Sequence, residues 1–139
     1  MALAPPREIR VLVVDDAEPG RKMLIEVLSA CSAIRIAEQA VDGLSGFALA
    51  AKLQPDLVIT DLHLPGRDGF QLTALLRQQY PAMRSIIVSV DDTPTCQAAS
   101  RLNGADGFVS KWRLLQDLPP LLAALFPDGA EPATAPCDP

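Results

Sequence analysis

Five polar side chains stand where short apolar runs of the sequence end: Asp15, Asp16, Asp61, Ser89 and Lys111. Crowded carboxylates repel one another, and a divalent cation with oxygen ligands, such as Mg²⁺, relieves that repulsion. A lysine attracts an anion such as phosphate as a point charge, and a serine hydroxyl can donate a hydrogen bond to it. Carboxylates also act as nucleophiles that form aspartyl phosphates. The set therefore predicts metal-assisted phosphoryl chemistry with Asp61 as the nucleophile.

The position of Asp61 supports this interpretation. It closes the apolar run that begins at Leu57 and is followed by the turn residues Pro65 and Gly66. An unpaired charge inside a strand buried on both faces is too costly, whereas the carboxyl end of a parallel strand opens into a crevice where ligands bind. Two plainer roles stay open: Asp61 as a turn-capping acid, and Asp15 and Asp16 as caps of the following helix.

Apolar runs alternate with helical periodicities along the chain. Strands are expected at residues 9–14, 33–40, 57–61, 85–90 and 107–110. Helices are expected after each strand, beginning near Glu18, Gly43, Asp68 and Pro94, with a last helix across Leu114 to Leu125. Pro119 and Pro120 must lie in the first turn of that last helix or kink it. This alternation predicts an α/β fold with a parallel sheet and helices on both faces.

Composition limits the class of protein. The chain has 139 residues, of which 49% are hydrophobic and 21% charged, with a net charge of −5. These values favour one domain at 9–126 and argue against a nucleic-acid-binding surface. We expect a loose arm at 1–8 and a Pro/Ala-rich disordered tail or linker stub at 127–139. No apolar stretch is long enough to span a membrane, no signal sequence is visible, and three scattered cysteines favour the reducing cytoplasm.

An ordered set of motifs gives a family resemblance over roughly residues 9–126. The matching pieces are residues 11–16, 55–61, 64–69 and 104–108, together with Ser89 and Lys111. This set resembles the receiver domain of two-component response regulators. The resemblance implies a flavodoxin-like, doubly wound (βα)5 fold with a five-stranded parallel sheet of order 2-1-3-4-5.

The resemblance also implies a role for each site residue. Asp61 would accept a phosphoryl group from a sensor histidine kinase or a phosphotransfer protein. Asp15, Asp16, Asp61 and the backbone carbonyl of His63 would bind Mg²⁺. Ser89 and Lys111 would contact the phosphoryl group, and Phe108 would turn inward as a switch residue when Ser89 moves. The fourth helix, fifth strand and fifth helix would then present a changed surface to an output partner.

Two departures from the family pattern, and the residues at two tuning positions, bear on this function. Trp112 follows Lys111, where receivers usually have a proline that is often in the cis form. Since a cis bond before a non-proline residue costs about 3 kcal/mol, we expect a trans bond or an altered loop here. Val90 is branched where the family prefers a small residue, and we expect this difference to narrow access to Asp61. His63 and Asp91 occupy the two positions that tune dephosphorylation in the family.

Two functions follow as alternatives. The first is a stand-alone, phosphorylation-activated receiver, which is no enzyme but assists its own phosphorylation and slow dephosphorylation. Residues 104–111 resemble receivers that precede a helix-turn-helix DNA-binding domain, and a homodimer is compatible with the sequence. The second is an interaction module that works without phosphorylation, which Trp112 and Val90 favour. A nucleotide-binding enzyme is disfavoured because neither a glycine-rich dinucleotide turn nor a phosphate-binding loop follows the first strand.

Overall fold

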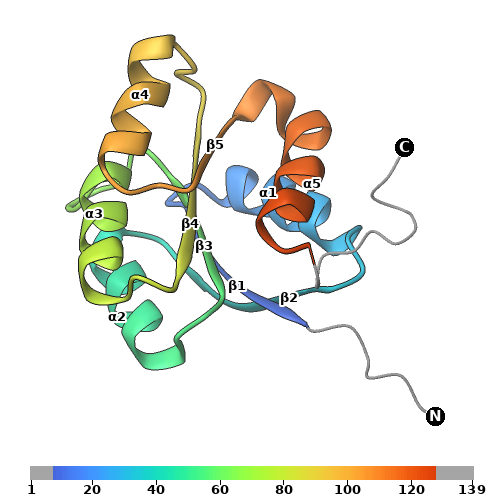
Figure 1. The fold of residues 1–139 in the computed structure, drawn as a ribbon, viewed down its shortest axis with the longest axis horizontal. Helices are drawn as coiled ribbons and strands as arrows, with labels where there is room; N and C mark the ends of the chain where they lie inside the picture. Colours follow the sequence, from blue (N-terminus) through green and yellow to red (C-terminus); the bar gives the residue numbers. More distant parts are fainter. Residues whose placement is uncertain (1–7, 128–139) are drawn as a thin grey trace.

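The computed structural model describes residues 8–127, in which strands and helices alternate (Figure 1). The strands are β1 (Ile9–Val14), β2 (Ile34–Ala40), β3 (Leu57–Asp61), β4 (Arg84–Ser89) and β5 (Gly107–Ser110). The helices are α1 (Glu18–Ser29), α2 (Gly43–Leu53), α3 (Gly69–Gln79), α4 (Pro94–Leu102), the short 3-10 helix η1 (Lys111–Arg113) and α5 (Leu114–Leu125). The predicted arm and tail fall, apart from Glu8 and Pro127, outside the described residues.

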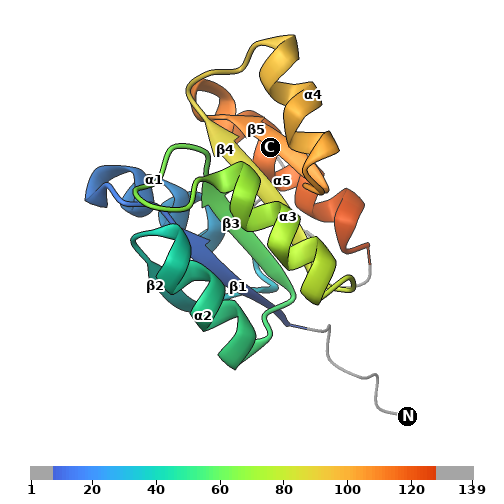
Figure 2. The ribbon, with the colours of Figure 1, turned by 90° about the vertical axis from the view of Figure 1, so that its left-hand side faces the viewer.

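The five strands form one parallel sheet of order β2-β1-β3-β4-β5, which confirms the predicted topology. Helices α1 and α5 cover one face, and α2, α3 and α4 cover the other (Figures 1 and 2). The strand register aligns the carboxyl ends of the strands. Val14 pairs with Thr60, and Asp61 pairs with Val88. The residues that end β1, β3, β4 and β5 therefore meet at one edge of the sheet, as expected for a doubly wound fold.

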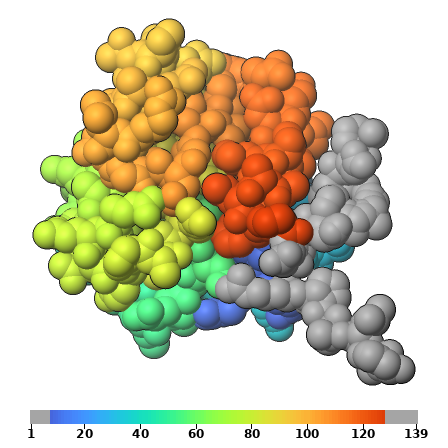
Figure 3. All heavy atoms as spheres, in the orientation of Figure 1, coloured from blue at the N-terminus to red at the C-terminus, as the bar shows by residue number. Residues whose placement is uncertain are grey.

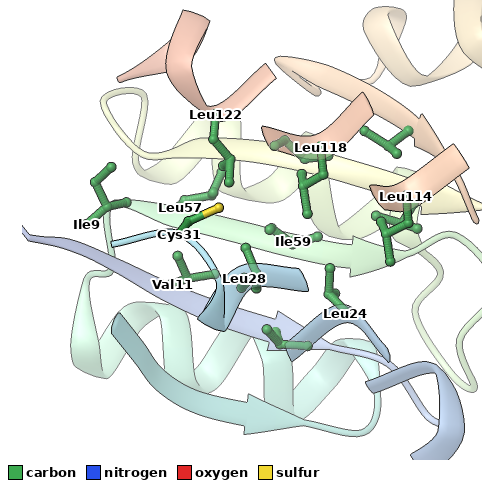
Figure 4. Packing of buried hydrophobic residues seen from close by; sticks show 14 of the residues in the cluster. Ile9, Val11, Leu24, Leu28, Cys31, Leu57, Ile59, Leu114, Leu118 and Leu122 are labelled. Atoms are coloured by element: carbon green, nitrogen blue, oxygen red, sulfur yellow. The ribbon is translucent and has the colours of Figure 1, made fainter. Parts of the chain in front are cut away.

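Alternate strand residues build the core on the two faces of the sheet. On the α1/α5 face, the cluster includes Leu24 and Leu28 of α1 and Leu114, Leu118 and Leu122 of α5, packed on Val11, Leu57 and Ile59 (Figure 4). On the other face, Leu72 and Leu76 of α3 pack on Leu12 and Val58. Two-sided burial explains why these strands are nearly continuous apolar runs.

Of the two positions expected for the prolines of α5, the structure excludes the first turn of the helix. The helix begins at Leu114, so Pro119 and Pro120 lie inside it and not in its first turn. A proline lacks the N–H that would bond to the carbonyl four residues earlier, here those of Leu115 and Gln116. Both residues are exposed, so water can hydrate their carbonyls. Buried Leu118 and Leu122 hold this helix on the sheet despite the missing bonds.

Replacing Leu118 with alanine should destabilise the fold by about 2–5 kcal/mol, because the side chain is fully buried between α5 and the sheet. Leu115 lies on the same helix but is 69% exposed, so Leu115→Ala should change the free energy of unfolding by less than about 0.5 kcal/mol. Urea denaturation of both variants measures the difference. Equal losses would show that α5 does not pack on the sheet as described.

The backbone around the end of β3 is fixed by the start of α3. Asp68 caps this helix by accepting a hydrogen bond from the Gln71 N–H, and Gln71 bonds back to the Asp68 N–H, forming a capping box. The Gly69 N–H donates to the Leu62 carbonyl at 2.8 Å. A Cβ at position 69 would lie 2.7 Å from the Asp61 carbonyl oxygen, so only glycine allows this close approach. No helix within residues 8–127 is both long and apolar enough to cross a membrane.

Candidate functional site

The polar side chains predicted to converge do so at the carboxyl edge of the sheet. Asp15 and Asp16 follow β1, Asp61 ends β3, Ser89 ends β4 and Lys111 follows β5. Asp15 is 2% exposed and Ser89 is fully buried, whereas Asp16 is exposed to solvent. The site is therefore a partly buried acidic crevice with one open side.

The three aspartates form a cluster suited to a hard cation. One carboxylate oxygen from each of Asp15, Asp16 and Asp61 lies within 4.8 Å of the others. An all-oxygen set of few carboxylates with an open, solvated side is what Mg²⁺ uses, since that ion keeps several of its waters. The Asp15 Oδ1 accepts a hydrogen bond from the Ala17 N–H at 2.9 Å, so Asp15 also supports the start of α1. The backbone-carbonyl ligand at His63, whose side chain is exposed, stays a prediction.

Lys111 links the two more buried carboxylates. Its Nζ lies 3.3 Å from Asp15 Oδ2 and 3.4 Å from Asp61 Oδ2. The lysine side chain is 24% exposed, against 3% for Asp15 and 11% for Asp61. A cation held this way offsets part of the repulsion between the carboxylates and stands ready to meet an incoming anion.

The surroundings of Asp61 make its charged form costly. Burial raises the pKa of Asp61 above the ordinary value of 3.8; Lys111 opposes this rise and the charge of Asp15 adds to it. A divalent cation at the cluster would favour the charged form, so the protein environment disfavours a bare carboxylate that a metal ion would stabilise.

Asp61→Asn should therefore gain stability over the wild type as the pH rises. The folded wild type keeps the Asp61 proton at pH values above 3.8, where the unfolded chain loses it. The stability that this proton contributes to the folded wild type is therefore fully present below pH 3.8 and is lost as the pH rises through the raised pKa of Asp61. Asparagine stays neutral, and the stability difference should grow across this window and then level off. Urea midpoints measured in chelator across a pH series check this, with the exposed Asp92→Asn as control. A difference that shrinks with rising pH would contradict the assigned cause.

Ser89 and Asp91 are tied together in the loop after β4. The Asp91 N–H donates to the Ser89 Oγ at 3.0 Å. The Asp91 Oδ1 accepts from the Thr93 N–H and hydroxyl, at 3.3 and 3.1 Å, next to the start of α4. The Ser89 hydroxyl can thus accept from this loop and still donate its own proton to another group. Movement of Ser89 would therefore shift the loop that leads into α4, because Asp91 is hydrogen-bonded to both Ser89 and Thr93.

Two residues that depart from the family pattern, Val90 and Trp112, line a cavity beside Asp61 and Lys111. Val90 is 50% exposed and Trp112 is 74% exposed. The described residues contain no cis peptide bond, so Lys111 joins Trp112 by a trans bond, as expected. Lys111 and Trp112 lie in η1, where the Ser110 Oγ accepts a hydrogen bond from the Trp112 N–H at 3.2 Å. Phe108 is half-buried and packs on the cluster formed by Leu62, Ile87, Cys96 and Ala105; its switching role stays a prediction.

The sequence prediction missed two residues that position Asp15. A Cβ at Gly20 would lie 2.6 Å from Asp15 Oδ2, so a side chain there would push the carboxylate away. The Arg21 guanidinium donates to the Asp15 backbone carbonyl at 2.9 Å and anchors the end of β1 to α1. The signal for Gly20 was present, because glycine within a helix is unfavourable and often marks a close approach. No comparable signal marks Arg21.

Comparison with known proteins agrees with this geometry. The family sequence profile of the response regulator receiver domain matches residues 11–122. The chain belongs to this family. The receiver domain of NarL from Mycobacterium tuberculosis is a similar solved structure, with 31% identity and a TM-score of 0.71 over 76% of this chain and 86% of that one. The response regulator domain of CheB from Thermotoga maritima has 28% identity and a TM-score of 0.76 over 88% and 96% of the two chains.

The curated relatives are longer proteins with different outputs. A protein-glutamate methylesterase/protein-glutamine glutaminase of Anaeromyxobacter dehalogenans is 37% identical over 73% of this chain and 26% of its own length. The probable transcriptional regulatory protein NarL of M. tuberculosis is 30% identical over 80% and 51%. The chain thus spans about a quarter to a half of the length of these relatives. One of them is named as an enzyme and the other as a transcriptional regulator, so the similarity does not indicate one kind of output.

Proposed function

We propose that this receiver is activated by phosphorylation of Asp61. The observation that carries the proposal is the position of Lys111, whose Nζ lies 3.3 Å from Asp15 and 3.4 Å from Asp61 beside the three-carboxylate cluster. An ordinary strand-end acid needs neither a bridging lysine nor two further carboxylates. Family membership supports phosphorylation-dependent signalling as the general function. A histidine kinase or phosphotransfer protein is the proposed donor.

The residues divide the chemistry among them. An Asp61 oxygen attacks the phosphorus of the donor phosphohistidine, the P–N bond breaks, and its electron pair leaves with the imidazole. Asp15, Asp16 and Asp61, with the His63 carbonyl, would hold Mg²⁺, which neutralises charge on the transferring phosphoryl group. Lys111 pairs with a phosphoryl oxygen once Asp61 is modified. In this proposal the receiver assists its own phosphorylation and its own slow dephosphorylation, and it turns over no separate substrate.

The output of the modification is proposed to be a changed surface formed by α4, β5 and α5. These elements lie at the β5 edge of the sheet, on the side facing the viewer in Figure 3. Phosphorylation would draw the Ser89 hydroxyl toward the new oxygens, shift the loop held by Asp91, and let Phe108 repack. This is a population shift between two states, biased by the added charge and acceptor oxygens. A cytoplasmic output partner or a second copy of the chain would read this surface.

Ser89→Ala should still accept a phosphoryl group but lose the response at this surface. The hydroxyl is the group proposed to sense the phosphoryl oxygen, whereas Asp61 and Lys111 remain in place. Amide chemical shifts of Phe108 and α4, recorded before and after phosphorylation, measure the response. Shift changes as large in the variant as in the wild type would remove Ser89 from the coupling. The fully buried Ser100 on α4, mutated to alanine, serves as the control.

Incubation with acetyl phosphate and Mg²⁺, followed by intact-mass measurement, tests the proposed function. We expect the wild type to gain one phosphoryl group, and chelation of the metal to prevent the gain. No mass gain from any small phosphoryl donor would favour the second function, an interaction module that works without phosphorylation. The observation that favours this second function is the presence beside the site of two exposed apolar residues that depart from the family pattern, Val90 and Trp112.

A further inference from the structure

Arg21 is a cation next to the acidic cluster that the proposed phosphoryl chemistry does not use. It lies in the first turn of α1 and is half-buried. Its Nη1 donates to the Asp15 backbone carbonyl at 2.9 Å, and its Nε donates to the side-chain oxygen of Gln39 at 3.3 Å. Because a guanidinium presents its donors in a rigid, planar fork, these two bonds fix the position of the whole group. Arg21 therefore joins α1 to the ends of β1 and β2.

A β-bulge in β2 places Gln39 beside Arg21. The parallel register shifts by one residue between Val11 and Leu12 of β1, so β2 holds one extra residue at this point. A shift of one residue moves the side chains that follow to the other face of a strand. Without the bulge, the carboxylate of Glu38 would occupy the position of Gln39 and would compete for the guanidinium through a stronger, charge-assisted bond. The neutral amide leaves the guanidinium on the Asp15 carbonyl.

Asp15 is fixed in both its backbone and its side chain. Its N–H donates to the Ala40 carbonyl at 3.0 Å, and its own carbonyl accepts from Arg21. One carboxylate oxygen accepts from the Ala17 N–H, and the other lies 3.3 Å from the Lys111 ammonium. The most buried carboxylate of the cluster is thus held at every polar atom before any metal ion binds.

Asp16 depends on Asp15 for its position. It is exposed, and its carboxylate makes no hydrogen bond or ion pair with any other residue in the described range 8–127. The carbonyl that Arg21 holds belongs to the planar peptide group that joins Asp15 to Asp16. By fixing this plane, Arg21 fixes the direction in which Asp16 leaves Asp15. The hydrogen bond from Arg21 therefore helps to set the two carboxylates relative to one another.

We propose that Arg21 is a positioning residue that gives the aspartate cluster its preference for Mg²⁺ over Ca²⁺. The inference rests on the proposed function, because it requires the cluster to bind the metal ion. Mg²⁺ demands near-octahedral geometry at short distances, whereas Ca²⁺ accepts a larger and more variable set of oxygens. Loss of a contact that fixes the carboxylates should therefore weaken the binding of Mg²⁺ more than that of Ca²⁺. Since both ions carry two charges, the ratio of their affinities is insensitive to net charge.

The test measures the dissociation constants of Mg²⁺ and Ca²⁺ for the full chain, without a phosphoryl donor. The fluorescence of Trp112, the single tryptophan, follows each titration because Trp112 and Asp15 line the same cavity, and calorimetry provides a second readout. Arg21→Ala should weaken Mg²⁺ binding by roughly tenfold, as is usual when a partner that orients a metal ligand is lost, and Ca²⁺ binding by less than about twofold. Arg21→Lys, which keeps the charge and a donor for the carbonyl, should recover part of this loss.

Lys22→Ala is the matched control. Lys22 is the next residue of α1 and is exposed, and its removal changes the net charge equally. Both dissociation constants should change by the same small factor in this variant, which leaves their ratio unchanged. Gln39→Ala, which removes only the support of the guanidinium, should reduce the preference for Mg²⁺ less than Arg21→Ala does.

The remaining outcomes separate this inference from the proposed function. Equal weakening of both ions in Arg21→Ala would indicate general damage to the site, and tighter binding of both would show that Arg21 acts only through its charge. Either result, an unchanged variant, or a wild type without preference for Mg²⁺ would overturn the inference while leaving the phosphorylation of Asp61 intact. A wild type that neither binds Mg²⁺ nor gains a phosphoryl group would instead reject the proposed function, and this inference with it.

Discussion

Replacing Asp61 with asparagine should abolish phosphorylation of the chain, with a fall in rate of more than about 10³-fold, as expected when a nucleophile is removed. The neutral amide oxygen is a poor nucleophile and cannot form a stable acyl phosphate. The variant keeps the size of the side chain at the end of β3, and the lower repulsion with Asp15 should leave the fold at least as stable. Intact-mass measurement after incubation with acetyl phosphate and Mg²⁺ gives the extent of modification.

Asp92→Asn is the matched control for this loss. Asp92 is an exposed acid in the loop after β4, outside the three-carboxylate cluster, so its neutralisation should leave the rate within about twofold. A phosphorylated Asp61→Asn variant would show that another residue accepts the group. An equal loss in both variants would attribute the effect to net charge and not to the nucleophile.

Replacing Lys111 with methionine should reduce the phosphorylation rate by roughly 10²-fold, the usual cost of removing one charged or hydrogen-bonding group from developing oxyanion charge. Two effects of the loss act in the same direction. The phosphoryl oxygens lose their pairing cation, and the pKa of Asp61 rises further because Lys111 no longer opposes the effect of burial. Rates from stopped incubations with acetyl phosphate, at saturating Mg²⁺, measure the fall.

Lys52→Met supplies the comparison for Lys111. Lys52 is an exposed lysine near the end of α2, away from the carboxyl edge of the sheet, and its removal changes the net charge equally. The rate of this variant should match that of the wild type. If Lys111→Met also retained the wild-type rate, the lysine would be a structural partner of Asp15 and Asp61 with no role in transfer.

Most of the fold was predictable because strands buried on both faces of a parallel sheet consist of nearly continuous apolar runs, which are visible in the sequence. The strand that ends at Asp61 is an example. Its residues Leu57, Val58 and Ile59 are all fully buried, and Asp61, the first charged residue of the run, marks its end. The convergence of Asp15, Asp61 and Lys111 then followed from topology alone, since strand ends share an edge. The positions of these residues at the ends of predicted strands were therefore enough to predict that they meet.

Other features depend on three-dimensional packing that local sequence does not record. The sequence left open whether Pro119 and Pro120 lie in the first turn of the last helix or kink it. Burial of Leu118 and Leu122 stabilises a helix that begins at Leu114 with both prolines inside it. The cavity beside Asp61 forms only because α1, the loop after β4 and η1 approach one another. No periodicity in any of these segments indicates that Met23, Val90 and Trp112 are neighbours.

The most direct test of the central claim is to locate the phosphoryl group itself. Wild-type protein incubated with Mg²⁺ and a small phosphoryl donor is treated with borohydride, which reduces an aspartyl phosphate to homoserine, and the peptides are sequenced by mass spectrometry. We expect homoserine at position 61, dependent on both donor and metal. Homoserine at another aspartate, or none under conditions that phosphorylate a reference receiver, would contradict the assignment of Asp61 as the phosphoacceptor.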